Sequence, residues 1–245
     1  MKKIGFFSFL FLALISTISY AKPVAGALNV NSVMNSPQFS SSIQMILGIA
    51  LISLAPFFLI SVTSFLRIII VFSLIRTAIG TQQVPPTSVL IGLAFFMTVF
   101  IMNPVWQEVN SKAVVPYNQG KISEMKAFDA GMVPLKKFML RQVREKDLAL
   151  FVQFSGIKPP TKPEDVPVYV VIPSFMISEL KTAFQIGFLL FIPFIIIDLV
   201  VANILLSLGM FMLSPVMVSL PFKILLFVLV DGWNLITRGL LMSFR

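Results

Sequence analysis

The chain contains no cysteine and no histidine. Without cysteine it cannot form a disulfide or use a thiol nucleophile, and without either residue it lacks the usual ligands of a structural zinc site. Histidine is also the most frequent general base near neutral pH. We therefore expect no metal, no cofactor and no conventional enzyme chemistry.

Charge is scarce as well. Charged residues make up 12% of the chain and hydrophobic residues 57%, whereas a soluble domain carries about 25% charged residues. The apolar surface must be covered by lipid, by partner subunits or by both. The formal charge of +9 is scattered, without the basic stripe of a nucleic-acid interface, so we expect no nucleic-acid partner.

Two further absences narrow the function. The sequence has no Gly-x-x-x-x-Gly-Lys-Ser/Thr loop, so we do not expect the chain itself to hydrolyse ATP. The acidic residues of the apolar segments are isolated from one another, which leaves no carboxylate pair for acid–base catalysis.

The N-terminus has the pattern of a secretory signal peptide. Two lysines precede an apolar run over 4–18, and Ser19 and Ala21 are small residues at the positions that the peptidase reads. We predict a signal peptide over 1–21 that is cleaved between Ala21 and Lys22. An uncleaved anchor helix is the alternative. A polar mature N-terminus over 22–42 follows.

A first apolar helix pair is predicted over 43–106, where the only charges are Arg67 and Arg76. The first helix is predicted to run up to Leu66, which makes it long enough to span a membrane, with a kink at Pro56. After the breakers Gly80 and Pro85-Pro86, the second helix is predicted from Val89 to about Trp106, with Asn103-Pro104 fraying its end.

Charged residues return over 107–182, which we predict to be a hydrophilic insert. An amphipathic helix is expected over 134–144, and Asp147 can cap a second short helix that ends at Gly156. Residues 168–172 are predicted to be extended, with a new helix starting at Pro173.

A second apolar helix pair and the C-terminus occupy 183–245. Asp198 and Lys223 are the only charges between 183 and 230, and a tight turn is predicted near Leu208-Gly209. The fold class is therefore all-α and membrane-associated, with four kinked apolar helices as hairpins and a helical hydrophilic insert. The signal peptide and the Arg67/Arg76 loop place that insert in the periplasm.

Several stretches resemble the FliP family of type III secretion export-gate proteins. The similarity covers nearly all of residues 43–240, and the motifs that carry it are Thr63-Ser64-Phe65-Leu66-Arg67, Gly80-Thr81-Gln82-Gln83-Val84-Pro85-Pro86, Ser178-Glu179-Leu180-Lys181-Thr182, Leu220-Pro221-Phe222-Lys223 and Val230-Asp231-Gly232-Trp233.

The resemblance implies a subunit of the bacterial inner membrane within the flagellar basal body. Five copies would assemble with FliQ and FliR into a cone that is raised toward the periplasm, and the cone would recruit FlhB and FlhA. Unfolded rod, hook and filament proteins would pass along its axis. The equivalent subunit of a virulence-type injectisome is the alternative, and the signal peptide favours the flagellar branch.

The resemblance also gives the turn after residue 208 a role. In the family this place carries a methionine-rich loop at the channel constriction, which here corresponds to Met210, Phe211 and Met212. Methionine is flexible and adapts to irregular partners. Composition alone favours ordinary apolar packing for these residues, and the resemblance reverses that preference.

Charged residues in apolar helices usually face a partner or a cavity. We therefore predict buried or inter-subunit roles for a set of five residues: Arg67, Glu179, Lys181, Asp198 and Lys223. Lys223 is expected to pair with an acid. Glu179 of a neighbouring copy is the first choice and Asp198 is another, while snorkelling of Lys223 to the membrane surface is the alternative. An exposed ion pair between Glu179 and Lys181 is also compatible with the sequence.

Two other functions remain open from the residues alone. A small-solute carrier also uses broken apolar helices, but it would need inverted repeats and more interior polar groups. An intramembrane enzyme is disfavoured by the missing histidine, cysteine and paired acids. Assembly with FliQ-like and FliR-like partners would separate export from both.

Overall fold

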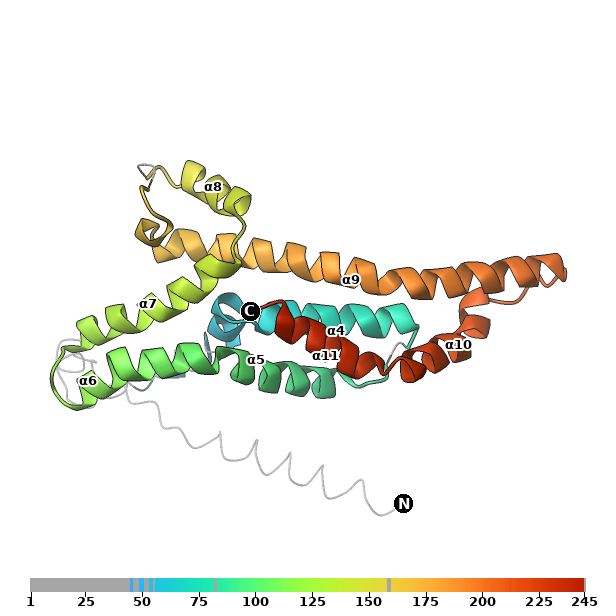
Figure 1. Cartoon of the computed structure of the whole chain (residues 1–245), viewed down its shortest axis with the longest axis horizontal. Coiled ribbons are helices and arrows are strands. Elements are labelled where there is room, and N and C mark those ends of the chain that lie inside the picture. Colours follow the sequence, from blue (N-terminus) through green and yellow to red (C-terminus); the bar gives the residue numbers. More distant parts are fainter. Residues whose placement is uncertain are drawn as a thin grey trace, which may run out of the picture. The chain divides into compact units, whose positions relative to one another are not determined.

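The structure is a computed structural model of the chain. It describes residues 56–81, 83–157 and 160–244, together with isolated positions 45, 49–50 and 53–54. The chain divides into two compact units, Met1–Ser53 and Leu54–Arg245, and the helices labelled in Figure 1 belong to the second. The predicted cleavage between Ala21 and Lys22 lies outside the described residues.

The regular structure that these residues form is helical (Figure 1), which confirms the all-α prediction. A short helix over Pro56–Val62 precedes α4. The elements are then α4 (Phe65–Ile79), α5 (Thr87–Val109), a π-helical turn η2 (Asn110–Val114), α6 (Val115–Asn118), α7 (Glu124–Gln142), α8 (Glu145–Phe154), a 3-10 turn η3 (Pro163–Asp165), α9 (Val168–Ser207), α10 (Pro215–Leu229) and α11 (Gly232–Met242).

The first apolar segment is sharply bent. The helix over Pro56–Val62 meets α4 at 88°. The hydroxyl of Thr63 donates to the carbonyl of Leu59 and accepts the N–H of Phe65 at 3.3 Å. A side chain that bonds nearby backbone groups in this way competes with helical hydrogen bonding. The prediction of one helix up to Leu66 was therefore wrong, because the chain turns at Thr63-Ser64.

Helix α4 is the centre of the main hydrophobic core. Ile68, Val71, Phe72 and Ile75 are almost completely buried, and side chains from α5, α9, α10 and α11 surround them. Burial of each such side chain contributes about 1.5–3 kcal/mol. The helix ends at Gly80, whose φ of 89° lies in the left-handed region that glycine adopts without strain.

Two predicted helix boundaries were wrong, because Pro104 and Pro173 both lie inside a helix and neither marks its end or its start. Helix α5 continues through Pro104 to Val109. Helix α9 begins at Val168 and runs 40 residues, with Pro173 and Pro193 inside it, so the segment over 168–172 is not extended. Apolar helices tolerate internal proline because neighbouring helices support the freed backbone groups.

The hydrophilic insert has a second core of its own. Helix α7 begins at Glu124, earlier than predicted. Its buried Phe138 and Met139 pack with Met102 of α5 and Phe175 of α9. The two long helices therefore extend from the apolar bundle into the insert, and the same backbone supports both regions.

The helices fit a membrane protein. Thr87–Asn118 and Val168–Ser207 are each long and apolar enough to cross a membrane, and two bent helix pairs bring the possible number of spans to four. Only 11% of the most apolar stretch of α9 is buried within the chain. The remainder of that apolar surface needs lipid or partner protein to cover it.

Candidate functional site

The loop between α9 and α10 has a well-defined start. Gly209 has a φ of 71°. Its N–H donates to the carbonyl of Leu206 at 3.1 Å, and the N–H of Met210 donates to the carbonyl of Leu205 at 2.9 Å. These two bonds form a Schellman motif, which ends a helix and turns the chain away from its axis. Helix α10 then starts at Pro215, whose fixed φ suits a first helical position.

The side chains of this loop are apolar and exposed. The exposed fractions are 46% for Met210, 75% for Phe211 and 99% for Met212. The loop joins α9 and α10 at the end of their hairpin (Figure 1). Three neighbouring apolar side chains in water are unfavourable, so the loop is suited to contact another surface.

The base of this hairpin contains an ion pair. The Nζ of Lys223 donates to Oδ2 of Asp198 at 2.6 Å, and the Ser219 hydroxyl donates to Oδ1 of the same carboxylate. Lys223 is 3% exposed, which argues against snorkelling. Of the two acids that the sequence offered as partners, the structure joins Lys223 to Asp198.

Glu179 has a different partner. The Nε of Arg67 donates to Oε2 of Glu179 at 2.8 Å, and Nη2 donates to Oε1. The sequence hypothesis paired Lys223 with Glu179 of a neighbouring copy, whereas within the chain each of the two residues already has another partner. It also contradicts an exposed Glu179–Lys181 pair, because Glu179 is fully buried and Lys181 is exposed.

Arg67 uses all of its donors within the chain. Besides Glu179, it donates to Oε1 of Gln142 and to both the carbonyl and the hydroxyl of Ser243, each at 3.0 Å. Its guanidinium carbon lies 3.9 Å from the centroid of the Phe244 ring. Five donors thus meet five acceptors, and the bonds join α4 to α7, α9 and the C-terminal segment.

A third polar cluster joins α8 to α9. The Ser178 hydroxyl donates to Oδ2 of the buried Asp147 at 2.8 Å and accepts the backbone N–H of Arg144 at 3.1 Å. The Arg144 guanidinium donates to Thr182 at 3.0 Å and also to Gln185. Asp147 was predicted only as a helix cap. Sequence reasoning missed Gln142, Arg144 and Ser243, because nothing in their local pattern distinguishes them from surface residues.

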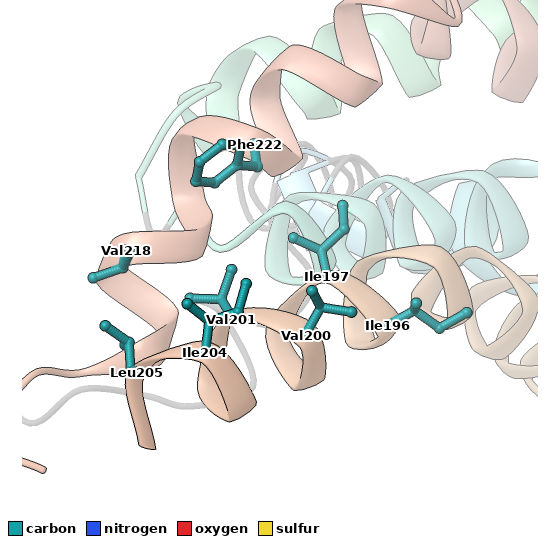
Figure 2. A pocket seen from close by; sticks show the side chains of 8 residues that line it. All are labelled: Ile196, Ile197, Val200, Val201, Ile204, Leu205, Val218 and Phe222. Atoms are coloured by element: carbon teal, nitrogen blue, oxygen red, sulfur yellow. The ribbon is translucent and has the colours of Figure 1, made fainter. Parts of the chain in front are cut away.

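An apolar groove of about 440 Å³ lies between the distal parts of α9 and α10. Figure 2 shows the side chains that line it, which are Ile196, Ile197, Val200, Val201, Ile204, Leu205, Val218 and Phe222. A small-molecule site normally includes a few polar groups that orient the ligand. This lining supplies no such side chain, so it suits an apolar surface better than a substrate.

Comparison with known proteins identifies the family. The sequence profile of the FliP family matches residues 48–240. The chain belongs to the FliP family. It is 51% identical to the flagellar biosynthetic protein FliP of Bacillus subtilis, over 89% of this chain and 98% of that protein.

Two further FliP proteins show the same relationship. The FliP of Pectobacterium carotovorum is 51% identical over 83% of this chain and 79% of its own length. The FliP of Caulobacter vibrioides is 48% identical over 89% of this chain and 82% of its own length. The predicted family is therefore confirmed. FliP proteins are membrane components of flagellar biosynthesis and export rather than a known enzyme family.

Proposed function

We propose that this chain is a subunit of the flagellar type III export gate. With FliQ-like and FliR-like partners and several copies of itself, it forms the channel through which unfolded rod, hook and filament proteins leave the cell. FlhB and FlhA are the proposed neighbours at the inner membrane. The virulence-type injectisome remains the alternative, and the named relatives, all flagellar proteins, favour the flagellar role.

The loop of Met210, Phe211 and Met212 is the observation that supports this function most directly. A channel for unfolded protein must admit side chains of every kind and still hold back ions when it is empty. Flexible apolar side chains resist wetting, yet they yield to a passing segment. Several copies of this exposed loop around one axis would provide such a constriction.

The proposed location is the inner membrane within the flagellar basal body, with the insert on the periplasmic side. The predicted signal peptide supports this orientation. Arg67 and Arg76 do not support it as a cytoplasmic loop, because both lie in α4 and Arg67 bonds Glu179 and Gln142 of the insert. A reporter that is active only after export, fused near Lys126, is expected to be active. Activity of a cytoplasm-specific reporter at the same site would contradict the orientation.

Gene deletion and complementation test the function. A deletion strain is expected to lose secretion of flagellar hook and filament proteins, and the intact chain is expected to restore it. Native mass measurement of the purified chain should then show an assembly with FliQ-like and FliR-like subunits. A monomer or dimer in a strain that secretes normally would contradict the proposed channel.

A further inference from the structure

Helix α11 presents a polar stripe on the outside of the bundle. Asp231 at its start, Asn234 and Arg238 are exposed, and Thr237 is half-buried. Residues at spacings of three and four lie on one helical face. The opposite face carries Ile236 and Leu240, which belong to the main core.

The neighbouring exposed faces have a different character. Helix α5 exposes Phe95, Phe96, Val99 and Phe100, and the second half of α9 exposes a continuous series of large apolar side chains. Such surfaces suit lipid or the apolar faces of partner subunits. The described part of the bundle therefore has apolar faces and, on α11, a stripe of polar side chains beside the exposed Leu235 and Met242.

The charges of the stripe differ from those of the interior. Arg67, Asp198 and Lys223 each bond an opposite charge within the chain. Among the ion pairs of the described residues, none involves Asp231 or Arg238. An ionisable side chain in a membrane helix faces a partner or a water-filled cavity, because lipid does not solvate it.

The stripe also borders an open groove of about 670 Å³. Leu93 of α5 contributes an apolar side chain, as do Trp233, Leu241 and Met242 of α11. Asp231, Asn234, Thr237 and Arg238 contribute an acid, an amide, a hydroxyl and a base. A mixed wall of this kind has no preference for one class of side chain. It fits an extended polypeptide of varied composition together with its water better than it fits lipid.

We propose that the α11 stripe forms part of the wall of the water-filled passage and contacts the unfolded polypeptide in transit. This inference rests on the proposed export function. It places the apolar constriction and the wetted wall on different elements. The loop after α9 seals the empty channel, and α11 lines the water-filled passage.

Single-cysteine accessibility tests this inference directly, because the chain has no cysteine of its own. Asn234→Cys and Arg238→Cys are compared with Phe96→Cys and Val99→Cys, which sit on the exposed apolar face of α5. Each is expressed in the deletion strain and treated with a charged, membrane-impermeant methanethiosulfonate during export. We expect the α11 cysteines to react at least about tenfold faster than the α5 cysteines.

Secretion by the same cells provides the second readout. Coupling a bulky polyethylene-glycol maleimide to the α11 cysteines is expected to reduce hook-protein secretion severalfold, with little effect when wild type is treated. Slow reaction at Asn234→Cys and Arg238→Cys would overturn the inference. So would fast reaction without loss of secretion, which would place the stripe in water outside the passage.

Two controls keep the outcomes distinct. The first is the double variant Asp231→Cys/Arg238→Cys. If it forms a disulfide between copies, and the reagent labels neither single variant, then a second copy covers the stripe. The inference that the stripe lines the passage would then be wrong. If the untreated wild-type chain does not restore secretion in the deletion strain, the proposed export function fails instead.

Discussion

At the scale of single residues, buried charge explains how the chain holds its polar groups inside an apolar bundle. Arg67 and Glu179 are 2% and 0% exposed, and the arginine bonds five acceptors. Removing charges from water is costly unless every donor and acceptor is matched. The matched set therefore specifies one arrangement of α4, α7 and α9.

Glu179→Ala leaves the guanidinium of Arg67 buried without its carboxylate. Breaking a buried ion pair in this way costs about 3–5 kcal/mol, so the detergent-purified protein should unfold at a markedly lower temperature. Lys181→Ala is the matched control, because this charge is on the same helix but exposed. Equal melting temperatures for the two variants would show that the pair does not stabilise the fold.

The pair of Asp198 and Lys223 is expected to couple energetically. Asp198→Ala and Lys223→Ala should each reduce the yield of assembled complex, because each leaves one charge with no partner at the base of the hairpin. The double variant removes both charges and should lose less than the sum of the single losses. Strict additivity in this double-mutant cycle would contradict a direct interaction in the assembled state.

At the scale of elements, α4 and α9 approach each other closely at Gly187. A Cβ atom built on Gly187 of α9 would lie 2.2 Å from Cδ1 and 3.2 Å from Cβ of Leu74. Rotation of Leu74 can move its Cδ1, but its Cβ is fixed to the backbone of α4. A side chain at position 187 therefore forces the two helices apart.

Gly187→Ala is expected to lower the melting temperature for this reason. Gly92→Ala on α5 provides the control, because no atom lies within 4 Å of a Cβ built there. Alanine is favoured over glycine within a helix by about 1 kcal/mol, so this variant should be unchanged or slightly more stable. A gain in stability from Gly187→Ala would mean that the bundle accommodates the methyl group.

At the scale of the whole molecule, the chain has large exposed apolar surfaces in addition to its buried core. The hairpin of α9 and α10 ends in exposed Met210, Phe211 and Met212, and its flanks form an apolar groove. Covering such surface stabilises an assembly by about 25 cal/mol per Å². The isolated chain thus exposes apolar surface that needs lipid or partner protein to cover it.

Replacing Met210 and Met212 together with alanine is expected to leave assembly intact but to let the closed channel leak. The shorter side chains of several copies would no longer fill the axis, so ions and small dyes should enter cells that express the variant. Conductance and dye uptake measure this, and normal secretion complexes on native gels confirm assembly. A variant complex as tight as wild type would place the seal on another subunit.

Much of the fold was predictable because hydrophobic periodicity and breakers are local properties of the sequence. The glycine that ends α4 and the turn at Leu208-Gly209 both follow from them. The bend at Thr63-Ser64 was not predictable, because it depends on a hydroxyl taking backbone hydrogen bonds. The proline positions gave wrong helix boundaries for a related reason. Tertiary packing, which the local sequence does not show, decides whether a helix continues through a proline.

The sequence by itself determined that this is an all-helical membrane protein of the FliP family. It also singled out Arg67, Glu179, Asp198 and Lys223 as charges that need partners. Only the tertiary structure decided the partners: Arg67 with Glu179, and Lys223 with Asp198. Arg67 and Glu179 are separated by 112 positions in the chain, and no local pattern encodes such a pairing. It follows from how α4 packs against α9, which brings the two side chains together.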